Sequence, residues 1–495
     1  MTKGPNTHLA DLFRLTGWSK GELARLVNRQ AGAMGHTQLS TDTSRVRRWI
    51  DMGESPRDPV PKVLAYLFTE RLGRVVTVED LGFGRAGRSG ARQSVDDLPW
   101  PPERTTEVLT EFTGMDLMLN RRGLMGAGAV LTSGSAIGNG LSDWLTAPAA
   151  LPAQSGHGAH AGQPSPVSLR PDQARYGRVE ATPVGYQEIE ALEHSVEVFR
   201  AWDASRGGGL QRKAVVGQLN EVGGMLSYRH PERLQRRLWG VAANLAVLAG
   251  WMSHDVGLEP TAQKYFVIAT HAARESGDRP RTSEALSRAA RQMVHVGRPE
   301  DALDLMRLAY RAGGPLPPKA RAMLRTIEAW ARASLGQAEP TRRALGEAEE
   351  AYVQEGYGEP TPSWMQLFDE ADLYGMQALA FRTLAEHEPS AARSAQRHAR
   401  RALELRPGGR QRSKIFDHLS LAGACLISED PEQADRYVRL ALLTINENSS
   451  HRTWDRLRDT QRLTEPYARH PRIAELREEI DLALPRPNGR GGTWS

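Results

Sequence analysis

The feature that most constrains the fold of this 495-residue chain is a helical pattern that recurs through its C-terminal half. In each unit a helix, a tight Gly- or Pro-containing break and a second, alanine-rich helix follow one another. The starts of five such second helices are separated by 40, 39, 51 and 42 residues. These starts are Glu259, Pro299, Ala338, Pro389 and Pro431. Units of this size that bury a face against the next unit form a helical-hairpin solenoid. We therefore predict an all-α protein with an α-solenoid over residues 182–484.

Individual units resemble tetratricopeptide repeats. Residues Ala331–Leu345, ARASLGQAEPTRRAL, have the small-residue and glycine placement of that family. The resemblance implies a curved domain that offers a concave surface to a peptide, a protein or a small-molecule effector. Trp251 and Tyr265 are candidates for lining this surface, whereas most of the other tryptophans are expected in the core between helices.

The positive charge of the chain is concentrated at its N-terminus. Between Met1 and Arg92 there are fifteen Lys and Arg residues against nine Asp and Glu, whereas the remainder has 49 against 50. An excess of this kind in one domain favours an anionic partner there. The whole chain is rich in arginine, however, so arginine abundance alone does not indicate phosphate binding.

Within the basic region, residues 40–53 read STDTSRVRRWIDMG and predict a short helix. Thr41 or Asp42 can cap its start, and Gly53 stands where a left-handed residue commonly ends a helix. Val46, Trp49 and Ile50 share one side at helical spacing. The opposite side and the flanks carry Ser44 and three arginines, so the helix has one buried face and one basic face.

The surrounding residues predict a small helical domain over residues 1–83. A helix is expected from Asn6 to Leu15, ended by Gly17, and a second helix is capped by Ser19 and Glu22. A polar connection (30–39) leads to the basic helix. Apolar residues spaced as in a helix predict a fourth helix, and a further apolar cluster completes the core. These two sets are Val60, Val63, Leu64, Leu67 and Phe68, followed by Val75, Val76, Val78, Leu81 and Phe83.

The segments SKGELARLVN and SRVRRWIDMG resemble the Xre/Cro-type helix-turn-helix, through Ala24, Ser44, Val46, Trp49 and Gly53. The connection between the two helices is longer than the tight turn of that family. With the tetratricopeptide-like half, the chain resembles actinobacterial Xre-type regulators, including the NsdA type. The resemblance implies a homodimer on double-stranded DNA that negatively regulates differentiation and antibiotic production.

A helix of this family enters the major groove with its N-terminal residues foremost. On that basis Arg45 and Arg48 are expected to read guanine edges, and Thr43 and Ser44 to contact bases or phosphates. Arg47 and Lys20 are expected on backbone phosphates, which position the protein without specifying sequence.

Two alternatives remain open at this stage. The basic side of the helix can be a solvated surface without a ligand, or the chain can be a helical-repeat interaction scaffold whose N-terminal domain binds protein and not DNA.

Residues 84–181 are expected to be a linker, and residues 485–495 a disordered tail. The linker contains a Gly/Ala-rich apolar segment (120–145) in which Arg121 and Arg122 resemble a twin-arginine export signal. Its position inside the chain argues against export, so packing on the C-terminal domain or disorder is expected instead. His157 and His160 lack the further ligands that a metal site requires.

Chemistry-bearing motifs are not found in the sequence. Cys425 is the sole cysteine, so neither a disulfide framework nor a thiolate cluster for zinc is expected. There is no phosphate loop, no HExxH and no nucleophile elbow. The N-terminus has no apolar core of the signal-peptide type, and no stretch predicts a membrane span. We expect a cytoplasmic protein that is not an enzyme and has no cofactor, metal or membrane partner.

Overall fold

The structure is a computed structural model. It describes residues 4–33, 36, 38–57, 59–72, 76, 78, 80–83, 98–118, 131–146, 184–206, 209, 211–354, 362–366, 368–406, 408, 410–445 and 450–485. All regular secondary structure in these ranges is helical, with no β-strand, as the sequence predicts. Within the same ranges, no helix combines the length and apolar character needed to cross a bilayer.

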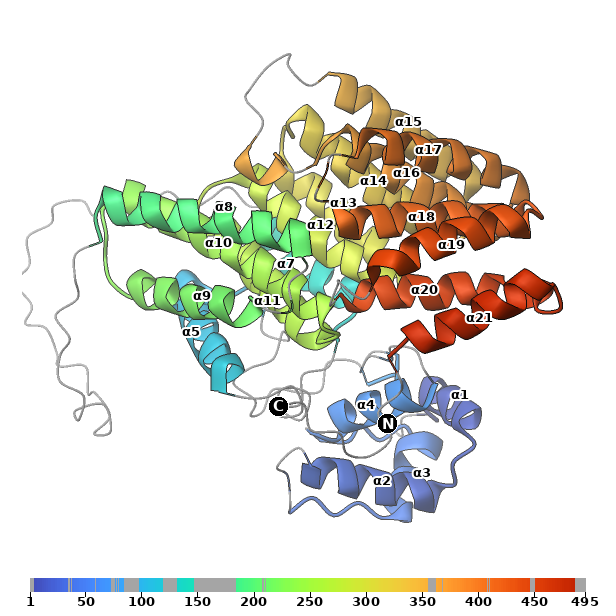
Figure 1. Ribbon diagram of the computed structural model, residues 1–495. Coiled ribbons are helices and arrows are strands. Elements are labelled where there is room, and N and C mark those ends of the chain that lie inside the picture. Colours follow the sequence, from blue (N-terminus) through green and yellow to red (C-terminus); the bar gives the residue numbers. More distant parts are fainter. Residues whose placement is uncertain are drawn as a thin grey trace, which may run out of the picture.

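Four helices form an N-terminal unit, by which we mean the described residues from 4 to 83 (Figure 1). They are α1 (Thr7–Thr16), α2 (Lys20–Ala33), α3 (Thr43–Asp51) and α4 (Val60–Leu72). Their inner faces, together with Val76, Leu81 and Phe83, form one buried core that is separate from the cores of the rest of the chain. The apolar periodicity of the sequence therefore identified the helices and the core of this unit correctly, while Val75 lies outside the described residues.

Local signals explain where the first two helices begin and end. The Asn6 side chain accepts a hydrogen bond from the Leu9 amide, and Gly17 ends α1 with a φ of 71°. The Ser19 hydroxyl oxygen accepts from the Glu22 amide at 3.1 Å, as expected of a capping residue. Helix α2 continues to Ala33, so the connection is shorter than the range 30–39 expected from its polar composition. The alanines at its end favour helix, and Ala31 is buried in the core.

The remaining helices form a C-terminal body, by which we mean the described residues from 98 to 485. The first part contains α5 (Pro102–Met118), α7 (Gly134–Thr146), α8 (Tyr186–Arg206), α9 (Arg212–Leu226), α10 (Glu232–Asp255), α11 (Glu259–Glu275), α12 (Arg279–His295) and α13 (Pro299–Gly313). The second part contains α14 (Pro318–Ser334), α15 (Ala338–Val353), α16 (Glu370–Ala385), α17 (Ala392–Leu405), α18 (Gln411–Ile427), α19 (Pro431–Ile445), α20 (His451–Leu463) and α21 (Pro471–Ala483). Three short 3-10 helices lie at Ser363–Met365, Pro389–Ala391 and Glu465–Tyr467.

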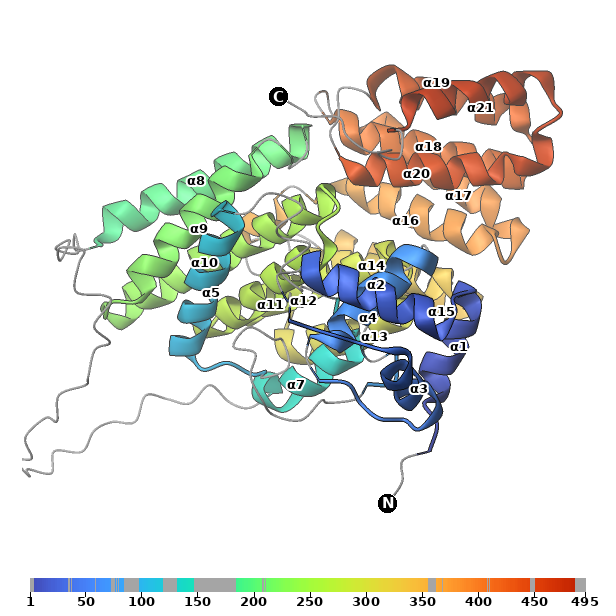
Figure 2. The same ribbon diagram turned by 90° about the horizontal axis from the view of Figure 1, so that it is seen from below.

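Consecutive helices of the body pack as pairs, most extensively α10 with α11, α12 with α13, α14 with α15, α16 with α17 and α18 with α19. The second helix of each pair begins at or within three residues of the start that the sequence predicted. Successive pairs extend from α8–α10 at one end of the body to α18–α21 at the other (Figures 1 and 2).

The same turn joins the two helices in four of these pairs. In the first, the Leu258 amide donates to Ser253 O at 2.9 Å and the Gly257 amide donates to His254 O at 3.0 Å. This is a Schellman motif, which needs a residue with positive φ. Gly257, Gly297, Gly336 and Glu429 occupy that position, with φ between 61° and 75°. Three of the four turns thus use glycine, and the fourth holds a glutamate in the left-handed region.

The described residues of the range 84–181, which was expected to be a linker, include helices α5 and α7 of the C-terminal body. Helix α5 packs on α9 and α11, and α7 packs on α13. Phe112 of α5 meets Tyr265 edge-on at 5.0 Å, and the Thr132 amide donates to the Gln263 side chain at 2.7 Å. Long-range contacts of this kind leave no periodic signal in the sequence, which is why composition alone suggested a linker.

Packing on the C-terminal domain was one of the two expectations for the segment 120–145, and residues 131–145 do pack there. Other predictions on this stretch and on the tail lie outside the described residues: residues 120–130, His157, His160 and residues 486–495.

Candidate nucleic-acid interface

Helix α3 is built by the local signals that its sequence contains. The Asp42 carboxylate caps it by accepting from the Arg45 amide at 2.8 Å. At the other end Gly53 has a φ of 62°, and the amides of Met52 and Glu54 both donate to Arg48 O, at 3.2 and 3.1 Å. A helix of nine residues is too short to be stable alone, so its packing decides whether it forms.

One face of α3 is anchored in the core of the N-terminal unit. Val46, Trp49 and Ile50 are at most 5% exposed, as the helical spacing predicted. Asn28 of α2 adds a contact that sequence reasoning missed. Its side-chain oxygen accepts from the Thr41 amide at 2.7 Å, and its amide group donates to Thr41 O at 2.8 Å. These two bonds tie the segment before α3 to α2, and an amide side chain midway along an amphipathic helix was the available signal.

The other face of α3 carries the predicted DNA-contacting residues. Thr43, Ser44, Arg45, Arg47 and Arg48 are all exposed. Lys20, from the first turn of α2, joins them because its Nζ lies 2.6 Å from Asp51 at the end of α3. The fold therefore brings all six predicted residues to the outer side of α3 or directly beside it.

The three arginines of this face already have partners within the N-terminal unit: two pair with carboxylates and one donates to a backbone carbonyl. Arg47 lies 3.5 Å from Asp51, Arg48 lies 3.4 Å from Glu54, and Arg45 donates to Ser40 O at 2.8 Å. Side chains this exposed form weak ion pairs, worth about 0–1 kcal/mol each. A guanidinium has five N–H donors, so each arginine keeps donors for another partner.

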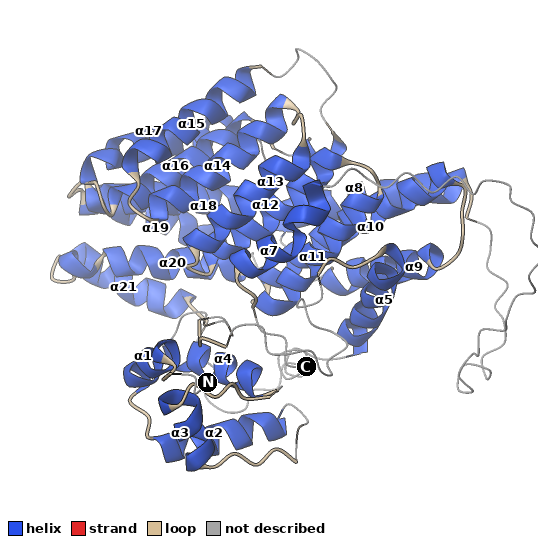
Figure 3. Cartoon of the chain, turned by 180° about the vertical axis from the view of Figure 1, so that it is seen from behind, coloured by secondary structure: helices blue, strands red, loops and turns tan. Residues whose placement is uncertain are grey.

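Helices α2 and α3 lie on the far side of the N-terminal unit in views from front and back, whereas α1 and α4 lie nearer the body (Figures 1 and 3). Helix α3 therefore lies in the part of the N-terminal unit that is farther from the body.

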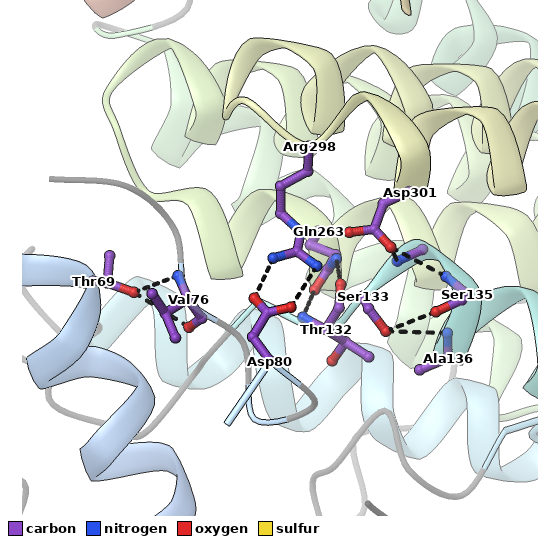
Figure 4. Close-up of polar contacts among 11 residues, drawn as sticks. Thr69, Val76, Asp80, Thr132, Ser133, Ser135, Ala136, Gln263, Arg298 and Asp301 are labelled. Atoms are coloured by element: carbon purple, nitrogen blue, oxygen red, sulfur yellow. Dashed lines mark hydrogen bonds and ion pairs between the residues drawn. The ribbon is translucent and has the colours of Figure 1, made fainter. Parts of the chain in front are cut away.

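A polar cluster joins the N-terminal unit to the body (Figure 4). Arg298, at the turn before α13, donates to the Asp80 carboxylate, with Nη2 at 3.1 Å from Oδ1. Arg298 also pairs with Asp301. The Asp301 carboxylate in turn accepts from the Gly134 amide at the start of α7, at 2.8 Å. Four residues thus link the N-terminal unit, α13 and α7.

Comparison with known proteins places one family model on the chain. The model described as the SP15 N-terminal domain matches residues 9–84, a range that includes most of α1, all of α2 to α4 and the residues of the exposed face. A search of curated proteins and a search of solved structures found no match. Among the described residues, no three His, Cys, Asp or Glu side chains are grouped in a way that would hold a metal ion.

Proposed function

We propose that the protein is a sequence-specific, double-stranded-DNA-binding transcriptional regulator that is not an enzyme. In this proposal residues 1–83 are a helix-turn-helix domain and residues 182–484 a tetratricopeptide-like solenoid. One observation carries it: α3 is anchored by Val46, Trp49 and Ile50, while its arginines, Thr43 and Ser44 lie exposed on its other side. A buried seam with a basic outer side is what a groove-reading helix requires.

In the proposed mechanism α3 enters the major groove. Arg45 and Arg48 donate to the O6 and N7 atoms of guanine, and Ser44 and Thr43 contact bases or phosphates. Lys20 and Arg47 contact phosphates at the edges of the groove.

The existing partners of the arginines do not prevent this. Each exposed pair is worth about 0–1 kcal/mol, whereas a bidentate arginine–guanine contact contributes about 1–3 kcal/mol of discrimination. The weak pair with Glu54 therefore leaves Arg48 able to contact a guanine edge.

The C-terminal body would serve as the sensor, with a peptide, protein or small molecule as effector. The polar cluster of Arg298, Asp80 and Asp301 supports this role because it joins the DNA-reading unit to α13 and, through Asp301, to α7. A homodimer on paired half-sites, and repression of differentiation and antibiotic production, follow from the resemblance to actinobacterial Xre-type regulators.

Fluorescence anisotropy on the full-length protein tests DNA binding. We expect affinity for a pool of genomic fragments to fall steeply with salt, because phosphate contacts release counterions. Arg45→Ala and Arg48→Ala should each remove sequence preference. Arg14→Ala serves as a matched control, since this exposed α1 residue carries the same charge and pairs only with Asp11 among the described residues.

If Arg45→Ala and Arg48→Ala both bind as the control does, the DNA-binding proposal fails. The N-terminal unit would then be better assigned to protein binding in an interaction scaffold.

A further inference from the structure

A cavity of 230 Å³ lies inside the C-terminal body. Its wall is formed mainly by the first helices of the successive pairs (α10, α12, α14, α16 and α18), with α8 and α20 at its ends. Eight arginines line it, which is unusual because arginine is seldom found in protein interiors unless it is paired. They are Arg200, Arg288, Arg291, Arg406, Arg410, Arg412, Arg452 and Arg456. Four carboxylates share the wall: Asp203, Glu284, Asp372 and Asp417.

Some of these arginines are structural. Arg406 Nε donates to Asp417 Oδ2 at 2.7 Å, and the same guanidinium contacts Asp372. Arg412 Nη1 donates to Asp255 Oδ2 at 2.9 Å. These buried pairs are held between helices and have their hydrogen-bonding capacity largely taken up, so they define the wall and leave little for a ligand.

Three other arginines surround one aromatic ring with donors unsatisfied. The guanidinium carbons of Arg452, Arg291 and Arg288 lie 4.4, 5.1 and 6.0 Å from the centroid of Trp251. Nε of Arg288, Nε of Arg291 and Nη2 of Arg452 are buried without a hydrogen-bond partner. Among the described residues Arg291 has no ion-pair partner at all, whereas Arg288 pairs with Glu284 at 3.3 Å and Arg452 Nε donates to the Asp255 carboxylate.

An arrangement of this kind is unfavourable without an anion. Burial, and then the charges of Arg452 and Arg288, lower the pKa of Arg291 well below its usual value. Contact with the face of Trp251 compensates only part of the lost hydration. The three guanidiniums also line the same cavity, and forked guanidinium donors gathered in one cavity can recognise a phosphate or carboxylate.

The apolar residues of the cavity wall indicate what the rest of the ligand is like. Met323, Ile327 and Leu379 line the cavity beside the arginines and are nearly covered. The volume is just below the roughly 300–1,000 Å³ of sites for drug-sized molecules, so the occupant is small. We propose that this cavity binds a small organic anion whose phosphate or carboxylate group lies on Arg288, Arg291 and Arg452 and whose apolar part packs on the three aliphatic side chains. The proposal deepens the sensor role of the body and rests on the cavity, whether or not α3 binds DNA.

Isothermal titration calorimetry on the full-length protein tests it with four probes: phenyl phosphate, benzoate, inorganic phosphate and phenol. We expect at least one of the two ring anions to bind, more tightly than inorganic phosphate, and phenol not to bind. Phenyl phosphate and benzoate differ in the anionic group, so their comparison separates a phosphate ligand from a carboxylate ligand. Absence of binding by both at millimolar concentration overturns the proposal.

Two variants locate the site. Arg291→Gln should weaken the tighter ring anion at least tenfold, whereas Arg393→Gln, an exposed arginine on α17, should change it less than twofold. Without ligand, Arg291→Gln should melt at or above the wild-type temperature, because it removes an unpaired charge from the interior. Equal effects of the two substitutions on affinity, or a lower melting temperature of Arg291→Gln without ligand, would contradict the assignment. Arg45→Ala should bind the same probe unchanged, so failure of DNA binding and failure of anion binding are distinguishable.

Discussion

His271 makes the stability of the C-terminal body depend on pH in a calculable way. It lies on α11 with no exposed surface, between Trp100 and Trp144, whose rings are each 4.6 Å from the imidazole. Nε2 accepts from the Trp100 amide at 3.1 Å, and Nδ1 is 2.9 Å from Val267 O, so Nδ1 holds the proton. Both nitrogens are engaged by the neutral ring, and a second proton would displace the Trp100 amide.

Burial lowers the pKa of His271 to about 4. An unfolded chain has a histidine pKa of about 6.5. Above the unfolded pKa both states are neutral and the contribution to stability is complete. As the pH falls below it, the unfolded state takes up a proton that the folded state refuses, so the free energy of unfolding decreases. With about 1.4 kcal/mol per pKa unit, the loss reaches about 3 kcal/mol when the pH has fallen through the folded pKa.

Urea unfolding of wild type and His271→Gln between pH 7 and pH 4.5 measures this. We expect the wild type to lose about 2 kcal/mol more than the variant over that range, because other titrating groups cancel in the difference. His8→Gln, at an exposed histidine of α1, should follow the wild-type slope. Parallel slopes for wild type and His271→Gln would refute the reasoning.

Three further outcomes follow from single contacts. Glu429→Gly should stabilise the protein by about 0.5–1 kcal/mol, because the strain of a glutamate in the left-handed region exceeds the entropy that glycine adds to the unfolded chain. Gly297→Ala should destabilise the protein by a similar amount, and thermal melts with the opposite ordering would contradict this reasoning. A double-mutant cycle on Asp80 and Arg298 should give a coupling of about 1 kcal/mol, and additive effects would exclude the contact between the unit and the body. Trp49→Ala should lower the free energy of unfolding of the N-terminal unit by about 3–5 kcal/mol, which hydrogen exchange would detect as lost protection of its amides. Unchanged protection of α3 would show that the helix does not need Trp49 as an anchor.

The parts of the fold that were predictable rest on local signals. Caps and glycines near Asn6, Gly17, Asp42 and Gly53 act within a few residues, so α1 and α3 appear almost where the sequence places them. Four of the five second helices of the body begin just after a glycine or with a proline, and α17 follows a 3-10 turn that begins at Pro389, so these residues mark the starts. Each of these signals depends on backbone geometry that neighbouring residues determine.

The contacts that escaped prediction are those between distant residues. Helices α5 and α7 are placed by pairs such as Asp116 with Arg212 and Trp144 with His271, which composition does not reveal. Arg291 likewise looks like any arginine in an arginine-rich chain until the fold brings it to Trp251. Of the candidate interface, the exposed side of α3 was predictable from periodicity, whereas the tie through Asn28 and the ion pairs of the arginines were not.

The central claim is that the outer side of α3 reads DNA in the cell. Chromatin immunoprecipitation with sequencing, on the full-length protein and on the Arg45→Ala/Arg48→Ala variant, tests it most directly. The proposal predicts discrete genomic peaks that share one sequence motif for the wild type, and loss of those peaks for the variant at equal protein level. Identical peaks for the two proteins, or no enrichment above background for the wild type, would contradict it.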